Sequence, residues 1–239
     1  MGQLDGRTYL VVGGSSGIGL ELVRRLRGEG ADVLVWSRTA PDELSELDVS
    51  HTVVDTTKSL EEQGISAPQR LDGLAYCPGS INLRPFSRLT DEDFLAEYEL
   101  NVLGAVRTLR LCLPALTHGD GASVVMFSTV AAQVGMGFHA SIGSAKGAVE
   151  GLGRSLAAEL APKLVRVNMV APSATDTPLA ERILGNEKKR EASAERHPLK
   201  RVGEPADMAA AAQYLLSPES GWMTGQVLRV DGGMSSVRV

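Results

Sequence analysis

Short apolar runs alternate with helix-periodic segments along the whole chain. The apolar, β-rich runs predict seven strands, at residues 8–12, 33–36, from 53–54 onward, 71–76, 123–128, 166–170 and 226–230. Apolar residues at helical spacing predict four helices. The first begins near residue 20 and stops at Gly28 and Gly30, and the others span 94–113 (ended by Pro114), 141–160 and 208–216. Such alternation is typical of parallel βαβ units. The pattern therefore predicts a single α/β domain over residues 1–239, with a doubly wound, mostly parallel sheet of Rossmann type.

Two polar segments interrupt this alternation. Residues 37–50 are too few for a full crossover helix followed by its strand, so a mostly irregular link is expected there. Residues 174–202 are polar, helical in pattern and rich in charge, which suits a mobile lid over a substrate. We call residues 174–202 the lid.

A glycine-rich turn follows the first predicted strand and opens the first predicted helix. It reads Gly13-Gly14-Ser15-Ser16-Gly17-Ile18-Gly19. Glycine turns after strands are common for purely structural reasons, but a dinucleotide pyrophosphate needs close backbone approach and free N–H donors at a helix N-terminus. The strand–turn–helix context favours the second interpretation. The residues predicted to cradle the cofactor phosphates are Gly13, Ser15, Ser16, Gly17, Ile18 and Gly19.

The end of the second predicted strand indicates which dinucleotide is bound. Proteins that bind NAD usually place an acid there to accept from the ribose 2′-hydroxyl. Here that place holds Ser37, followed by Arg38, whose guanidinium suits a 2′-phosphate. The alternative is that Arg38 is a solvated loop residue. NADP is therefore predicted in preference to NAD, with NAD still open.

Composition and charge narrow the classes of partner. The 239 residues are 43% hydrophobic and 22% charged, with a net charge of −5, which argues against nucleic acid or an anionic membrane as the main partner. Cys77 and Cys112 lie far apart and suit a reducing compartment. The four histidines lack metal-ligand spacing, so no metal is expected. Residues 1–7 contain no apolar stretch, so no secretory signal is expected and a cytoplasmic protein is predicted. Its expected partner is a small-molecule substrate.

With these motifs, the chain resembles the classical short-chain dehydrogenase/reductase family over essentially its full length. The family's TGxxxGIG motif corresponds to residues 12–19, with Val12 in place of threonine, and the Val230-Asp231-Gly232-Gly233 ending also matches. The family's NNAG turn is changed to Tyr76-Cys77-Pro78-Gly79, and its PG-x-x-x-T segment is similar to Pro172-Ser173 followed by Thr177. The further cofactor contacts that the resemblance implies are Asp55 and Thr56 near adenine, Pro78, Gly79, Lys146 and Thr177.

The same resemblance is incomplete at the catalytic residues. The family reduces carbonyls or oxidises alcohols with a serine and a Tyr-x-x-x-Lys motif. The lysine matches Lys146, the helical asparagine matches Asn101, and Thr129 stands for the serine, but the tyrosine position holds Ile142. Isoleucine has no ionisable group, and losing a positioned general acid costs on the order of 10²–10⁴ in rate if nothing replaces it.

His139 is the predicted replacement for the tyrosine. In the enoyl-reductase branch of this superfamily the tyrosine lies seven residues before the lysine, and here that position is His139. Histidine titrates near neutrality and is a suitable proton donor. The alternative is that His139 only precedes the helix that begins near Ser141. Ser141 and Ser144 are lesser candidates, because serine favours helix caps and surfaces.

The sequence thus leaves two functional hypotheses. The first is an NADP(H)-dependent oxidoreductase that transfers hydride to or from a small carbonyl, alcohol or conjugated alkene, with Asn101, Thr129, His139 and Lys146 as catalytic residues. The second is a catalytically impaired dinucleotide-binding protein, a sensor or a partner subunit. The resemblance also implies a homo-oligomer, a dimer or tetramer, whose helix pairs approach through the small residues Gly143, Gly147, Gly151 and Gly153.

Overall fold

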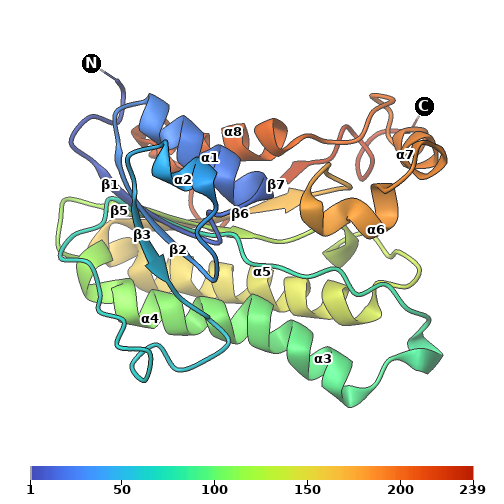
Figure 1. Ribbon diagram of the computed structural model, residues 1–239, viewed down its shortest axis with the longest axis horizontal. Helices are drawn as coiled ribbons and strands as arrows, with labels where there is room; N and C mark the ends of the chain where they lie inside the picture. Colours follow the sequence, from blue (N-terminus) through green and yellow to red (C-terminus); the bar gives the residue numbers. More distant parts are fainter. Residues whose placement is uncertain (1, 239) are drawn as a thin grey trace.

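A single seven-stranded parallel sheet organises the chain, described here by a computed structural model that covers residues 2–238 (Figure 1). The strand order is β3-β2-β1-β4-β5-β6-β7, and every pairing is parallel. The strands are β1 Thr8–Val12, β2 Asp32–Ser37, β3 Ser50–Val53, β4 Gly73–Tyr76, β5 Ala122–Phe127, β6 Val165–Pro172 and β7 Val227–Val230. The predicted doubly wound fold is confirmed, and the sheet is wholly rather than mostly parallel.

Helices cover both faces of this sheet (Figure 1). They are α1 Gly17–Gly28, α2 Asp42–Ser45, α3 Asp91–Tyr98, α4 Gly104–Leu116, α5 Ala140–Leu160, α6 Glu181–Leu184, α7 Glu187–Ala194 and α8 Pro205–Leu216. On one face α4 and α5 bury an apolar layer that includes Leu109 and Val149, and on the other α1 and α8 bury a layer that includes Val23 and Ala212. Each layer removes apolar area from water, the main stabilising contribution to such a fold. Within residues 2–238, no helix is both long and apolar enough to cross a membrane.

The sheet changes winding direction between β1 and β4. From β1 the chain first adds β2 and β3 on one side, then returns to place β4, β5, β6 and β7 on the other. The connections that leave β1 and β4 therefore run in opposite directions and open a crevice at the carboxyl ends of these strands. The glycine-rich turn follows β1 and Cys77-Pro78-Gly79 follows β4, so both predicted cofactor segments lie at this crevice.

The third strand differs from the sequence prediction. It spans Ser50–Val53 and pairs with β2 from Leu34 to Ser37, whereas the apolar pattern had it begin at Val53. Because β3 is the edge strand of the sheet, its side chains are mostly exposed and Val53 itself is 65% exposed. An edge strand needs no apolar run, so the polar residues before Val53 gave no signal.

The long helix after β4 also differs from its prediction, in two ways. Pro114 was expected to end the helix, but it lies inside α4, which continues for two more residues to Leu116. Between α3 and α4 the chain forms a π-helical turn, Glu99–Leu103, that contains Asn101. Such turns are often found at functional sites. The prediction of the later helix, α5, is confirmed to within one residue at its start.

Gly153 faces the sheet rather than a second helix, contrary to the sequence expectation, and sets how closely α5 approaches the sheet. A Cβ there would lie 2.1 Å from Sδ of Met169 and 3.2 Å from Cε of Met126. We expect Gly153→Ala to lower the free energy of unfolding by about 1–3 kcal/mol through overpacking. The matched control is Gly151→Ala in the same helix, where a Cβ meets nothing within 4 Å and the helix gains up to about 1 kcal/mol. Urea unfolding of both variants checks this, and equal effects would contradict it.

Candidate active site

A groove of about 580 Å³ lies at the carboxyl ends of β1, β2 and β4. It collects most of the residues that the sequence predicts for the cofactor. Those that line it are Gly13, Ser15, Ser16, Ile18, Ser37, Arg38, Asp55, Thr56, Pro78, Gly79 and Thr177. Gly17 and Gly19 do not line the groove, but they shape the turn beneath it. The structure therefore brings segments from five parts of the chain to one surface.

The glycines of the turn meet three different constraints. Gly13 has φ +77°, and a Cβ there would lie 3.0 Å from the nitrogen of Pro78. Gly17 has φ +52°, with Thr177 3.2 Å from where its Cβ would be. A Cβ at Gly19 would come within 2.2 Å of the Gly13 carbonyl oxygen. Side chains at these positions would strain the turn or push it off the neighbouring strands, so the turn needs glycine.

The N-terminus of α1 is free to bind an anion. Its cap residue, Ser16, makes no side-chain hydrogen bond to the first turn, and that turn contains no acid. The first backbone N–H groups of a helix lack partners within the helix and attract negative charge. Together with the open cradle of the glycine turn, this fits the pyrophosphate of a dinucleotide.

The far end of the groove holds the residues that the sequence predicts to meet the adenosine. Arg38 is the only cation and Asp55 the only acid among the lining residues. Ser37 has no carboxylate to present to a ribose, and its hydroxyl donates to the Thr39 carbonyl at 2.7 Å. Asp55 accepts from the Thr57 hydroxyl at 2.7 Å, which lowers its pKa and keeps the carboxylate ionised. Where an NAD site usually has an acid, the groove thus has Ser37, followed by the positively charged Arg38.

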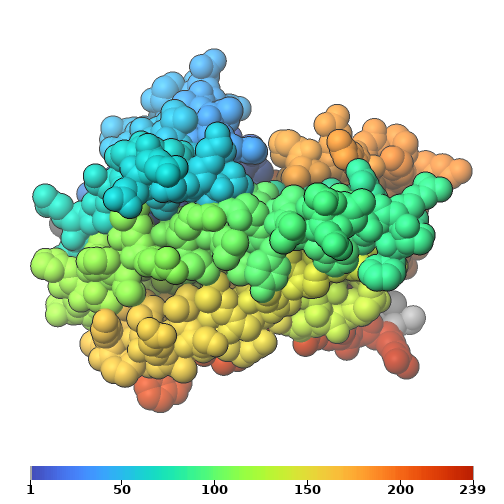
Figure 2. Space-filling model, turned by 90° about the horizontal axis from the view of Figure 1, so that it is seen from below, coloured from blue at the N-terminus to red at the C-terminus, as the bar shows by residue number. Residues whose placement is uncertain are grey.

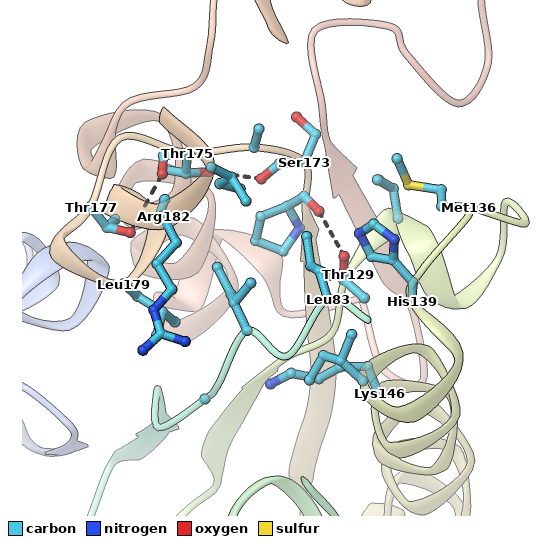
Figure 3. A pocket seen from close by; sticks show the side chains of 18 of the residues that line it. Leu83, Thr129, Met136, His139, Lys146, Ser173, Thr175, Thr177, Leu179 and Arg182 are labelled. Carbon is cyan, nitrogen blue, oxygen red and sulfur yellow. Dashed lines mark hydrogen bonds between the residues drawn. The ribbon is translucent and has the colours of Figure 1, made fainter. Parts of the chain in front are cut away.

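A second cavity, of about 690 Å³, continues from this groove. Ile18, Cys77, Gly79, Thr177 and Leu179 line both, so the two form one cleft. Figure 3 shows Thr129, His139 and Lys146 on one side of the cavity, and Thr177, Leu179 and Arg182 of the lid on the other. Three of the four predicted catalytic residues therefore face the same space. Ile142 also lines the cavity.

Lys146 lies on α5 at the floor of the cavity. Its Nζ donates to the Phe127 carbonyl at 2.8 Å. Burial lowers the pKa of Lys146 to about 8, and the nearby carboxylate of Glu97 opposes this shift only in part. A buried ammonium with one protein partner keeps two donors for other oxygens, such as ribose hydroxyls.

Asn101 lies behind the cavity wall rather than on it. Its Nδ2 donates to the Glu97 carbonyl at 2.8 Å and to the Glu97 carboxylate at 3.0 Å. Its Oδ1 is buried and has no hydrogen-bond partner among the described residues. A Cβ at Gly79 would lie 3.5 Å from Nζ of Lys146 and 3.6 Å from this Oδ1, so both atoms border the same space. A buried orphan oxygen beside a lysine fits a site completed by a bound group.

Tyr76 and Thr56 hold the turn that contains Asn101 in place. Sequence reasoning assigned Thr56 to the cofactor, and it missed this structural role of both residues. Tyr76, at the end of β4, donates its hydroxyl proton to the Leu100 carbonyl at 2.7 Å. Thr56 is 3.0 Å from the same hydroxyl. These bonds tie the π-helical turn to the sheet beside the cofactor groove. The only sequence signal was the replacement of the first asparagine of the NNAG turn by Tyr76.

Thr129 and His139 both line the cavity, and their side chains make few hydrogen bonds. The Thr129 hydroxyl donates to the Pro172 carbonyl over a long 3.4 Å. His139 occupies the N-cap position of α5 without capping it, and its Nδ1 donates to the Gly137 carbonyl at 2.6 Å. Ile142 is 5% exposed and offers only an apolar surface. The tyrosine position therefore supplies no proton.

A further histidine, absent from the sequence predictions, lines this cavity. His197 comes from the lid, just after α7, and is 2% exposed. Its Nε2 lies 2.8 Å from the hydroxyl of Ser173, which directly follows β6. Ser173 stands where the PG-x-x-x-T pattern has glycine, and that departure was the one signal that the sequence offered.

Comparisons with known proteins identify the family of this chain. A family model described as enoyl-(acyl carrier protein) reductase matches residues 12–235. The chain is 32% identical to a tropinone reductase homologue of Arabidopsis thaliana, over 98% of this chain and 80% of that protein. The chain belongs to the short-chain dehydrogenase/reductase family.

Solved structures of other family members have the same architecture. A short-chain type dehydrogenase/reductase from Mycobacterium ulcerans has a TM-score of 0.87 and 32% identity, covering 98% of this chain and 92% of its own. A candidate 2-deoxy-D-gluconate 3-dehydrogenase from Agrobacterium tumefaciens, solved with bound NADP, has a TM-score of 0.90 and 28% identity, covering 98% of both chains. This short-chain dehydrogenase/reductase is thus an oxidoreductase by family.

The buried state of Lys146 predicts a pH-dependent stability. Its pKa is about 8 in the folded protein and 10.5 ordinarily, so between these values the unfolded chain binds more protons and the unfolding free energy rises with pH. Lys146→Met removes this contribution. In the cofactor-free protein, the stability of wild type relative to the variant should increase from pH 8 to 10.5 and stay level below pH 7. Urea unfolding across this range tests it, and a constant difference would contradict it.

Proposed function

We propose that this protein is an NADP(H)-dependent oxidoreductase that acts on a small carbonyl, alcohol or conjugated alkene. The observation that supports this most is the continuous cleft from Arg38, past the N-terminus of α1, to Thr129 and Lys146. The bound dinucleotide would supply the hydride donor or acceptor. The protein would supply binding, orientation and proton transfer.

The residues of the groove would hold the dinucleotide along its whole length. The N-terminus of α1 would bind the pyrophosphate, with Asp55 and Thr56 at the adenine end. Arg38 would bind the 2′-phosphate through a charge-assisted contact. Lys146 would bind the ribose hydroxyls, and Thr177 would contact the nicotinamide end. The NADP in the Agrobacterium tumefaciens structure supports the choice of dinucleotide.

The cavity would bind a substrate with an apolar body and a single reacting oxygen or polarised double bond. Apolar side chains dominate its lining, among them Leu83, Met136, Phe138 and Ile183. Thr129 would orient the reacting oxygen with its hydroxyl. The lid contributes Leu179 and Ile183, which supports a role in enclosing the substrate. Exclusion of water would protect the hydride step.

The proton of the reaction needs a group other than Ile142. His139 is the group predicted from the sequence, and it lines the cavity one helical turn before Ile142. Its Nδ1 is engaged with the Gly137 carbonyl, which leaves Nε2 to face a partner. His139 therefore remains a candidate for proton transfer.

The family resemblance also supports a homodimer or homotetramer. Figure 2 shows α4 and α5 side by side across one broad face of the molecule. Gly147 and Gly151 on α5 have open space where a Cβ would be, so a second helix has room to approach closely. Free, unpaired Cys77 and Cys112 suit the proposed cytoplasmic location.

Arg38 provides a direct test of cofactor choice. We expect Arg38→Ala to raise the Kd for NADPH roughly 10–100-fold, because a hydrogen bond to a charged group contributes about 1.5–3 kcal/mol. The Kd for NADH should change by less than about threefold. Fluorescence titration of both dinucleotides measures this. Arg110→Ala, an exposed arginine of α4 outside the groove, is the control and should alter neither affinity.

Turnover decides between the two functional hypotheses. We expect wild-type protein to oxidise NADPH in the presence of at least one member of a panel of small ketones, aldehydes and conjugated enoyl compounds, or to reduce NADP⁺ with the matching alcohols. Steady-state absorbance at 340 nm follows the reaction. Tight NADPH binding without turnover on the whole panel would contradict the proposal and favour a sensor or partner subunit.

A further inference from the structure

Ser173 and His197 form a hydrogen-bonded pair inside the substrate cavity. Ser173 directly follows the last residue of β6, and His197 follows α7 in the lid, 24 residues later. The two meet at 2.8 Å between Oγ and Nε2, and both line the cavity that Thr129 and Ile142 also line. His197 is 2% exposed, so its ring is shielded from bulk water, and Ser173 is partly buried.

The second ring nitrogen of His197 fixes the direction of this hydrogen bond. Its Nδ1 lies 2.8 Å from the backbone carbonyl of Ser193, which can only accept. Nδ1 therefore carries a proton, and in the neutral ring Nε2 is the acceptor. The Ser173 hydroxyl then donates to Nε2. This is the arrangement of a hydroxyl with an adjacent base, and the base is itself oriented by a third group.

The pair is linked through the backbone to Thr129, the residue proposed to orient the substrate oxygen. Thr129 donates to the carbonyl of Pro172, the residue directly before Ser173. No carboxylate lines the cavity among residues 2–238, and Ile142 has no proton to give. Among the described residues, the ring of His139 bonds only to the Gly137 carbonyl and to no other side chain. Ser173 and His197 are thus the one hydrogen-bonded acid–base pair on the described cavity wall.

We propose that Ser173 and His197 transfer the proton of the reaction, in place of the missing tyrosine. This inference rests on the proposed oxidoreductase function. In alcohol oxidation, Oγ of Ser173 takes the alcohol proton while its own proton passes to Nε2 of His197. The C–H bond breaks, its electron pair leaves as hydride to the oxidised nicotinamide, and the carbonyl forms. The His197 imidazolium then loses its proton to water, and carbonyl reduction follows the same steps in reverse.

Ser173→Ala is the decisive variant. Ser173 is the catalytic residue of the pair, because it touches the substrate, and removal of its Oγ should lower kcat by on the order of 10²-fold or more. The Kd for NADPH should stay within about twofold of wild type, since the N-terminus of α1 and Arg38 are untouched. Ser173→Thr keeps a hydroxyl on the same backbone and should recover part of the loss.

His197 is a positioning and relay residue, so its test needs a readout that packing alone would not change. His197→Ala should lower kcat by a similar factor, and imidazole added to the buffer should restore part of the activity by filling the vacated space. The double variant with Ser173→Ala should be no slower than either single variant, because the two residues act as one unit. His197→Gln, of similar size, should remain slow because an amide does not accept the proton.

A measurement without turnover checks the pair itself. Nitrogen-15 NMR of the histidine rings should show protonated Nδ1 and unprotonated Nε2 at His197 in the neutral form. Ser173→Ala should shift the Nε2 resonance and leave that of His139 unchanged. A protonated Nε2 in the neutral ring would overturn the inference.

The kinetic outcomes separate this inference from the function on which it rests. Turnover by wild type that survives Ser173→Ala, but is lost in His139→Ala, would overturn the Ser173–His197 transfer and leave the proposed function standing. Wild-type protein that binds NADPH and turns over no member of the panel would overturn both. The small Ser173→Ala change decides the matter if the His197 variants fold poorly.

Discussion

The unpaired backbone amides at the N-terminus of α1 are the constraint on which the rest of the site depends. They are available because the turn from β1 into α1 is made of glycines that lie too close to Pro78, Thr177 and each other to carry side chains. The same close packing fixes α1 against the sheet at the point where the strand order reverses. The cleft extends from this turn in two directions, to Arg38 at one end and to the cavity with Lys146 at the other.

The cavity shows how binding and proton transfer can be separated in one fold. Nζ of Lys146 and the unpartnered Oδ1 of Asn101 border one space beside Gly79, where the proposed function places a ribose. The tyrosine position holds Ile142, which gives the cavity an apolar surface and has no proton to donate. Under the proposed function, the proton donor has to be another residue of the cavity wall. The lid reaches the cavity from the side opposite Ile142 and contributes His197 to its lining.

The sequence predicted the fold well, and the residues that it assigned to the cofactor gather in one groove, because both results depend on local signals. Apolar periodicity placed the central strands and α5, and the glycine turn, Asp55 and Arg38 lie in or beside short motifs whose spacing is set by backbone geometry. Prediction failed where tertiary context decides: β3 is polar because it lies at an edge. The meeting of Ser173 with His197 depends on how the lid folds back over 24 residues, which no local pattern encodes.

The central claim is that hydride passes between a dinucleotide in this cleft and a substrate in the adjoining cavity despite Ile142. Reaction with NADPH deuterated at each face of C4 in turn, followed by mass spectrometry of the product, tests it most directly. The account predicts a single deuterium on the reduced carbon, transferred from one face of the cofactor only. NADPH that binds in the groove and never delivers deuterium to any product would contradict it.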